Sequence, residues 1–253
     1  MKKARILFVI FFLFSLNGSA QFKQIAKKII GQDKPLLSQN EVISGLKEAL
    51  IVGTTNSANI LGVTDGYYKD ELVKILLPPE ADVIVKNINK IPGGNDLLED
   101  VLLRINRAAE DAVSEAKPIF VNSIKGMTIA DGFAILKGDD NAATQYLHKT
   151  TYNQLVELYR PKIKASVDKK LVGNISTAES WNQITGKWND LAKSIVGQVA
   201  GFKPVDVDLD EYLTNKALEG LFLKIETEEK QIRKDPMARV NSLLKRVFGT
   251  LDK

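Results

Sequence analysis

The sequence predicts an all-α protein: a single bundle-like domain of roughly eight to ten helices that follows an N-terminal signal peptide. Two observations support this fold class. Apolar residues recur at three- and four-residue spacing along most of the chain, and alternating strand patterns are scarce. The 253 residues, 44% of them hydrophobic, are also enough to bury a core without metal or disulfide bonds.

The first twenty residues have the three parts of an export signal. Lys2, Lys3 and Arg5 form a positive start, an almost entirely apolar stretch runs over residues 6–16, and small residues end at Ala20. The apolar stretch is much shorter than the roughly 20 residues that span a membrane. We therefore expect cleavage near Ala20, a periplasmic or secreted product, and no transmembrane span in the mature chain.

Four regions follow from this interpretation: a signal peptide (1–20), a short amphipathic segment (21–36), a helical domain (37–249) and a C-terminal tail (250–253). In the amphipathic segment, isoleucines and lysines alternate at helical spacing. This segment is expected to dock onto the domain, with a membrane surface or a partner groove as the alternatives.

Caps and prolines delimit the expected helices of the domain. A capping box at Ser38 and Glu41 begins the first helix, which carries apolar residues to Leu50. Further helices are expected over residues 70–77, 81–91, 96–116 with a continuation or restart at Pro118, 128–138, 146–171 with a kink or break at Pro161, 209–232, and 235–249. Residues 173–204 are rich in glycine, serine and threonine and allow a subdivision there, and residues 205–209 are expected to be an extended linker.

The helix expected over residues 209–232 has a polar side. Glu226 and Lys230, and likewise Glu229 and Arg233, stand four residues apart with the acid first. This order stabilises a solvent-facing helix surface.

Composition excludes several classes of chemistry. The chain has no cysteine, which removes thiol nucleophiles, thiolate metal sites and disulfides, and His148 is its one histidine. His148 is expected to be a partly exposed structural residue. Asp206, Asp208 and Asp210 resemble the start of a calcium loop, but the later glycine and glutamate of that motif are missing. We expect no catalytic residue, no metal site and no cofactor.

Charge argues against a nucleic-acid partner. The chain holds 35 basic and 31 acidic residues, and three of the basic ones lie in the signal. The mature chain therefore has 32 basic and 31 acidic residues, a net charge of +1. Such a balance lacks the general attraction for phosphates that nucleic-acid binders show.

Four residues are nominated as weak ligand-binding candidates: Asn106, Arg107, Glu110 and Asp131. The first three lie close enough along a helix for their polar groups to gather on one flank. A solvated ion pair explains Arg107 and Glu110 most simply, and a polar pocket or a clamp between helices is the alternative. Asp131 most simply completes a helix cap that begins at Thr128.

Several short blocks, in this order, resemble the bacterial domain of unknown function 4197 family. They are Leu61-Gly-Val-Thr-Asp-Gly-Tyr67, Val73-Lys-Ile-Leu-Leu-Pro78, Ile105-Asn-Arg-Ala-Ala-Glu110, Met127-Thr-Ile-Ala-Asp131, Ile135-Leu-Lys-Gly138, Ala142-Ala-Thr-Gln-Tyr146, Lys216-Ala-Leu-Glu-Gly-Leu-Phe222, Ile232-Arg-Lys-Asp-Pro236 and Val247-Phe-Gly249. The resemblance covers nearly all of the mature chain. It implies an exported, mostly helical bacterial protein of unassigned activity, and it supplies no catalytic residue.

The expected function is that of a non-catalytic binding or interaction protein of the bacterial cell envelope. Its partner would be a small or amphipathic ligand, held between helices by polar anchors, or an envelope protein. Two other classes stay open: a hydrolase that uses buried carboxylates, and an assembly or scaffold protein with an exposed apolar patch.

Overall fold

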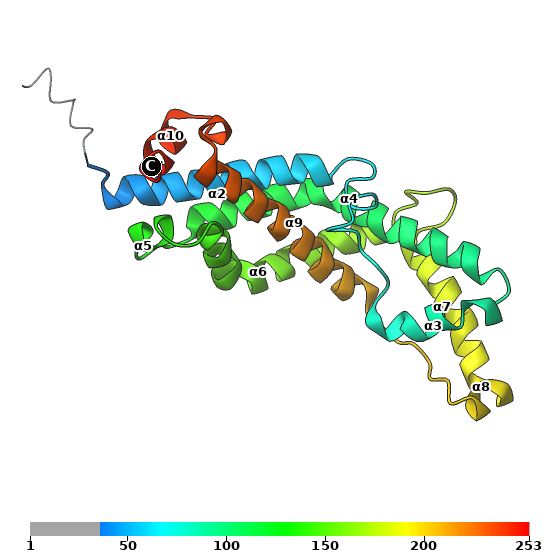
Figure 1. The fold of residues 1–253 in the computed structure, drawn as a ribbon. Helices are drawn as coiled ribbons and strands as arrows, with labels where there is room; N and C mark the ends of the chain where they lie inside the picture. The colour runs from blue at the N-terminus through cyan, green and yellow to red at the C-terminus, as the bar shows by residue number, and fades with distance from the viewer. Residues whose placement is uncertain (1–35, 253) are drawn as a thin grey trace, which may run out of the picture. The chain divides into compact units, whose positions relative to one another are not determined.

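The computed structural model describes residues 36–252, and every regular element among them is helical (Figure 1). In chain order the elements are α2 (Gln39–Leu61), η1 (Pro79–Ala81), α3 (Asp82–Lys86), η2 (Ile88–Lys90), α4 (Gly94–Gly126), α5 (Gly132–Leu136), α6 (Ala142–Val167), α7 (Thr177–Lys193), α8 (Ile195–Val199), α9 (Leu209–Lys234), η3 (Pro236–Ala238) and α10 (Ser242–Phe248). The predicted all-α fold is confirmed for this part of the chain. The predicted signal peptide lies outside the described residues, as does nearly all of the amphipathic segment.

The residues from Ser38 onward group into one compact unit, so the suggested subdivision at residues 173–204 is not observed. In the described part of the chain, no helix combines the length and the apolar character needed to cross a membrane.

Helix α2 begins where the capping box predicts. The Ser38 hydroxyl accepts a hydrogen bond from the Glu41 N–H (3.2 Å), and the Glu41 carboxylate accepts one from the Ser38 N–H (3.0 Å). The helix continues to Leu61, well past the apolar stretch that predicted it.

Small residues let neighbouring helices approach closely: a methyl group at Gly45 would lie 2.6 Å from the Val247 side chain of α10.

The core lies between the four long helices. Helix α9 packs against α2 and α6, and α4 packs against the same two helices. Figure 1 shows α9 crossing the other long helices at an angle. Apolar side chains at helical spacing are fully buried there, as the periodicity predicts. They include Leu46, Leu50, Ile105, Phe120, Leu155, Ile163, Leu221 and Ile225.

Two prolines lie inside helices instead of ending them. Helix α4 runs through Pro118, and α6 runs through Pro161. A proline in a helix interior removes one hydrogen bond and costs about 3 kcal/mol. Phe120 and Ile163, two residues beyond each proline, are fully buried, and this burial opposes a break in the helix.

Residues 70–77 are not helical, contrary to the prediction. A single turn is followed by extended backbone over residues 74–78. Val73, Ile75 and Leu77 are buried at two-residue spacing, which is the pattern of an extended segment. Leu72 and Leu76, which stand four residues apart as on one face of a helix, are exposed instead of buried.

The helix predicted over residues 81–91 is interrupted. The chain leaves the helical path at Asn87, whose side-chain amide donates to the carbonyl of Val83 at 2.9 Å, so that α3 and η2 are separate elements. Helix α4 then begins at Gly94 and not at Asp96, because Gly93 adopts a left-handed conformation (φ 69°) that ends the preceding turn.

The predicted last helix is also divided. Asp235 accepts from the N–H of Met237 at 2.8 Å and begins η3, and Asn241 caps the separate helix α10. Between them lies Arg239, which is 2% exposed. Its guanidinium donates to the carbonyls of Ile232 (2.9 Å) and Arg233 (3.0 Å), the last turn of α9. The break lets this buried cation fold back on the end of α9.

Glu229 and Arg233 form a buried ion pair (2.7 Å), which corrects their assignment to a solvent-facing side. Their exposed fractions are 1% and 5%. The Glu229 carboxylate accepts from the backbone N–H groups of Ala143 (3.0 Å) and Thr144 (2.7 Å). These belong to the first turn of α6, whose own N-cap residue makes no side-chain cap. Glu229 therefore caps α6 from another helix.

Arg233 serves the neighbouring helix end. It donates to the carbonyls of Ile135 (3.1 Å) and Leu136 (2.7 Å) at the C-terminal end of α5. An anion at the start of α6 and a cation at the end of α5 both match the helix dipoles. One ion pair on α9 thus fixes the α5–α6 corner.

Candidate functional site

Residues 62–78, here called the α2–η1 loop, connect α2 to η1 without regular structure. Connections longer than about 12–15 residues inside a domain are usually functional or disordered. Side chains of α4 and α9 fix this one at several points, which makes it the starting point for a candidate site.

Glu110 of α4 holds the first half of the loop. Its side chain is nearly fully buried, and its carboxylate accepts from the N–H groups of Tyr67 (3.0 Å) and Tyr68 (3.1 Å). Arg107 pairs with the same carboxylate at 2.7 Å and with Asp65 of the loop at 2.6 Å. The expected solvated ion pair is therefore wrong: the two side chains form a clamp between α4 and the loop.

Asp65 is held in an unfavourable backbone conformation. Its φ of 71° lies in the left-handed region, which a non-glycine residue adopts at a cost. Its carboxylate binds Lys69 at 2.8 Å as well as Arg107. Hydrogen bonds from Lys69 and then Arg107 lower the pKa of Asp65. Two cations thus stabilise the turn in its observed form.

Asn106 of α4 holds the second half of the loop. Its side-chain amide accepts from the N–H of Ile75 (2.9 Å) and donates to the carbonyl of Ile75 (2.8 Å). The amide pairs with the extended backbone much as a neighbouring strand would. It satisfies both polar groups of a buried residue that has no strand partner.

Helix α9 secures the other side of the loop. The buried Tyr67 hydroxyl donates to the carbonyl of Ala217 (2.8 Å), and the Tyr212 hydroxyl donates to the carbonyl of Leu76 (3.0 Å). Burial, followed by the charges of nearby carboxylates, raises the pKa of Tyr212 to about 12, so it stays a donor at neutral pH. Gly220 makes the approach possible, because a methyl group there would lie 2.8 Å from the Tyr67 ring.

Asp70 adds an ion pair with Lys224 of α9 and predicts a dependence on pH. Burial alone would raise the pKa of Asp70, but hydrogen bonds from Lys224 and the Leu72 N–H hold it below its ordinary value. The stabilisation is therefore complete above the unfolded-state pKa of about 3.9 and is lost as the pH falls through the lower folded-state value.

We expect Asp70→Asn to lower the free energy of unfolding at pH 7, measured by urea denaturation, by about 1 kcal/mol or less because the pair is partly exposed. The difference from wild type should shrink as the pH falls below the unfolded-state pKa of about 3.9, and it should vanish once the pH is below the lowered pKa of the folded wild-type carboxyl. Asp82→Asn, at an exposed position of α3, is the control and should leave the free energy of unfolding unchanged both at pH 7 and in acid. A difference that persists unchanged in acid would show that the charge of Asp70 does not matter.

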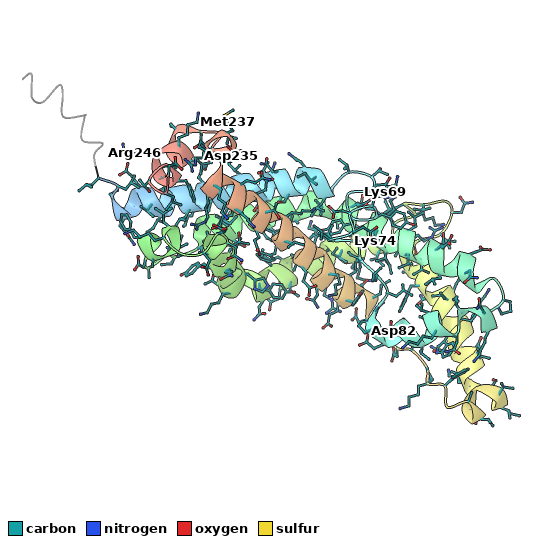
Figure 2. All side chains as sticks on the ribbon, viewed as in Figure 1. Lys69, Lys74, Asp82, Asp235, Met237 and Arg246 are labelled. Carbon is teal, nitrogen blue, oxygen red and sulfur yellow. The ribbon has the colours of Figure 1, made fainter. Side chains whose placement is uncertain are left out.

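A groove of about 780 Å³ opens beside the loop, between the loop, α3, α4 and α9. Its volume is typical of small-molecule sites. The apolar lining comprises Leu72, Val73, Ile75, Leu76, Leu77, Pro79, Val85, Leu98, Leu102 and Leu223, and the polar lining includes Lys74, Asp82, Tyr212, Lys216 and Glu219. In Figure 2, Lys74 lies on the loop and Asp82 at the start of α3. The anchored loop forms one wall of this groove.

The structure brings three of the four nominated residues together. Asn106, Arg107 and Glu110 all bind the α2–η1 loop, so they position the wall of the groove and do not line it. Asp131 lies elsewhere: it is the N-cap of α5 and accepts from the N–H of Ala134 at 2.9 Å, beside the start of α2. The loop follows the other end of α2, roughly 30 Å away along that helix.

The geometry gives no support to paired-carboxylate hydrolysis. Glu110 and Glu229 are nearly fully buried, yet they lie on different helices, and each is occupied by backbone N–H groups and an arginine. The pKa values of Asp65, Asp70 and Asp100 are lowered, whereas a general acid needs a raised one.

Metal and histidine chemistry find no geometric support either. Within residues 36–252, no group of three or more acidic or histidine side chains is placed to hold a metal ion. Asp208 is the N-cap of α9, and its carboxylate accepts from the Glu211 N–H and pairs with Arg160. His148 is exposed and stacks on Tyr152, with ring centroids 4.5 Å apart.

The residues that line the groove were missed at the sequence level. Leu72 and Leu76 were interpreted as part of a helix over residues 70–77, and Tyr212 and Leu223 were assigned to the α9 helix without a role. The available signal was the pair Pro78-Pro79 together with the apolar residues Val73, Ile75 and Leu77 at two-residue spacing, which favours an extended segment.

Comparison with known proteins leads to a family and no further. No curated protein matches the chain, and no solved structure matches it either. One family model matches residues 36–249, which include the α2–η1 loop, its anchors on α4 and α9, and every helix described above. The chain therefore belongs to the family described as protein of unknown function DUF4197.

Proposed function

We propose that this chain is an exported, non-catalytic binding protein of the bacterial cell envelope, and that the groove binds a single-chain amphiphile with an anionic head. One observation carries the proposal: a firmly anchored loop presents two leucines toward the groove while they remain largely open to solvent. Leu72 and Leu76 are 76% and 61% exposed, and both line the groove.

The exposed leucines are a source of binding free energy. Removing one such side chain from water stabilises a complex by about 1.5–3 kcal/mol. The loop needs no further ordering, because Asn106, Glu110 and Tyr212 already fix its backbone. A preorganised wall loses less entropy when a ligand binds.

The polar lining favours a charged head group on the ligand. Lys74 and Lys216 bring two ammonium groups to the lining, and ammonium groups bind carboxylates and phosphates as point charges. Lys216 also pairs with Glu219 at 2.7 Å, so an anionic head would compete with that carboxylate. Lys74 instead lies over the ring of Tyr68, with its ammonium 4.7 Å from the ring centroid.

The proposal includes export. The pattern of residues 1–20 supports a signal peptide that is cleaved near Ala20, which would deliver the domain to the periplasm or the exterior. Amphiphiles are abundant at membranes, so an envelope location fits the proposed ligand class.

The experiment measures amphiphile binding by the mature protein. Protein is purified from the envelope fraction, and its intact mass is expected to correspond to a chain that starts at Gln21. Isothermal titration with laurate and with dodecyl phosphate, below their micelle concentrations, should give saturable binding. The double variant Leu72→Gln with Leu76→Gln should bind laurate and dodecyl phosphate about a hundredfold more weakly than wild type, at roughly tenfold for each leucine. Lys74→Glu should weaken binding further by acting on the head group.

Val240→Gln is the matched control, because Val240 is as exposed as Leu76 but lies after η3, beyond the C-terminal end of α9, whereas the groove is lined by α9 residues no later than Leu223. Its affinity should equal that of wild type. The groove proposal fails if wild type binds neither amphiphile, or if the leucine variant binds as tightly as the control. An intact leader in the recovered protein would separately contradict export.

A further inference from the structure

Helix α8 and the residues around it form a surface that the groove does not use. The surface comprises α8, the end of α7, residues 200–203 and the neighbouring residues 90–92, and it is called here the α8 tip. In Figure 1, α8 lies at one end of the helical unit and α10 lies at the other. The features of the tip suggest what it contacts.

The backbone of the α8 tip is held firmly. Ser194 caps α8 by accepting from the Gly197 N–H at 3.1 Å, and Gly197 packs on the end of α7, where a methyl group would lie 2.1 Å from the Leu191 carbonyl. Gly201, with φ of 71°, then turns the chain so that the Phe202 ring rests 4.9 Å from the buried ring of Trp188. These contacts fix the backbone of the tip in one conformation.

This rigid tip presents aliphatic side chains to solvent. Ile195, Val196 and Val199 are 83%, 71% and 85% exposed. Single exposed apolar residues are ordinary, but these three stand at i, i+1 and i+4 on one short helix and so form one contiguous face. Contiguous exposed apolar surface marks interaction sites.

Four lysines belong to the same tip as the aliphatic face. Lys193 precedes α8, Lys203 follows it, and Lys90 places its ammonium 4.6 Å from the ring centroid of Phe202. Lys187 lies on α7 six residues before Lys193, and its ammonium donates to the carbonyl of Pro92, two residues after Lys90. Asp190 is the acidic residue within the tip, so the balance is four lysines to one aspartate, with Asp96 and Asp206 beyond its edges.

We propose that the α8 tip docks onto an anionic phospholipid bilayer, with Ile195, Val196 and Val199 inserted among the head groups and the lysines on lipid phosphates. Apolar insertion and attraction to anionic lipid add together in interfacial binding. Each lysine near such a surface contributes about a tenfold change or less in affinity at moderate salt. The inference stands on the tip alone and does not depend on the proposed function of the groove.

The size of the patch favours a bilayer over a second copy of the chain. A stable protein–protein interface buries roughly 1,200–2,000 Å² and uses about 20–30 residues on each side. Three aliphatic side chains on a five-residue helix are too few for that. The excess of lysines would also repel the same tip on a second copy, whereas it complements anionic lipid.

The test is co-sedimentation of the mature protein with vesicles. Wild type should bind vesicles of phosphatidylglycerol and phosphatidylcholine mixed in equal parts, should bind pure phosphatidylcholine vesicles at least about tenfold more weakly, and should lose affinity as salt rises. Ile195→Ser, Val196→Ser and Val199→Ser combined should reduce binding about tenfold or more. Lys193→Gln with Lys203→Gln should reduce it similarly and flatten the salt dependence.

The controls separate the tip from other surfaces. Met237→Ser with Val240→Ser removes comparably exposed apolar side chains near α10, where Figure 2 labels Met237, and should bind as wild type does. All of these positions are exposed, so the thermal midpoint of each variant should stay within about 2 °C of wild type.

A reporter variant tests insertion directly. Val199→Trp should show a blue-shifted emission on anionic vesicles, and brominated lipid should quench it. Three results would overturn the proposal. The first is that wild type does not bind anionic vesicles. The second is that the triple variant binds vesicles as tightly as wild type, which would assign binding to residues 21–36, and the third is that wild type self-associates and the triple variant loses this self-association but still binds vesicles.

Discussion

Replacement of Glu229 by alanine is expected to be the most destabilising single change to this domain. Glu229 caps the start of α6 and pairs with Arg233, and both side chains are buried. Removing one partner of a buried, hydrogen-bonded ion pair costs about 3–5 kcal/mol, because the other charge is left without compensation. For a domain of this size that lowers the melting temperature by about 10 °C or more.

Urea unfolding followed by tryptophan fluorescence measures this loss. Glu219→Ala is the control on the same helix, since its ion pair with Lys216 is solvent-exposed and should contribute under about 0.5 kcal/mol. Glu229→Ala combined with Arg233→Ala should cost clearly less than the sum of the two single changes, because the two residues act as one unit. A loss below about 1 kcal/mol in Glu229→Ala would contradict the role assigned to the pair.

Glu110→Ala is expected to have the second-largest effect, and it should impair binding as well as stability. The change leaves the N–H groups of Tyr67 and Tyr68 without their acceptor and Arg107 without its buried partner. Each unsatisfied buried group costs about 1–3 kcal/mol. The expected loss is about 3 kcal/mol, together with release of the α2–η1 loop.

Hydrogen exchange distinguishes release of the loop from general unfolding. In Glu110→Ala the amides of Tyr67, Tyr68 and Ile75 should lose protection first, while amides in the middle of α6 keep theirs. Amphiphile affinity should fall with the loop, because Leu72 and Leu76 lose their fixed position. Glu115→Ala, an exposed position on α4 that pairs with Lys162 at 3.0 Å, should leave exchange and affinity unchanged. Equal protection in both variants would show that Glu110 does not hold the loop.

Glu110→Gln provides an internal check on this interpretation. The amide oxygen can still accept from the two loop N–H groups, but the NH₂ group now faces the donors of Arg107. The effect should therefore lie between wild type and Glu110→Ala. The comparison separates the acceptor role of the side chain from its charge.

The parts of the fold that were predicted correctly depend on neighbours along the chain. Ser38 and Glu41 cap α2 within three residues of each other, and α9 begins at Leu209, where the expected linker ends. Asn106, Arg107 and Glu110 were singled out because helical spacing alone brings them to one flank. Local geometry also explains the partial success at the C-terminus, where Asp235 begins η3 as expected.

The parts that were predicted wrongly depend on distant contacts. Residues 70–77 are predicted as a helix that ends at Pro78, but Asn106 of α4 and Tyr212 of α9 bind the backbone of this stretch. The pair Glu229 and Arg233 looks like a surface pair in sequence, yet its partners lie on α5 and α6. No spacing within α9 reveals a contact made by the ends of two other helices.

The sequence by itself determined that this protein is built from amphipathic helices and where α2 and α9 begin, because burial at helical spacing and capping are short-range effects between neighbouring positions. It did not predict α7 or α8, and it wrongly predicted a helix over residues 70–77. Only the tertiary structure decided that the polar residues of α4 anchor a loop, that the loop walls a groove, and that the aliphatic residues of α8 face solvent. Those outcomes depend on which helix ends and faces meet in space, and the free energy of such contacts comes from residues far apart in the chain.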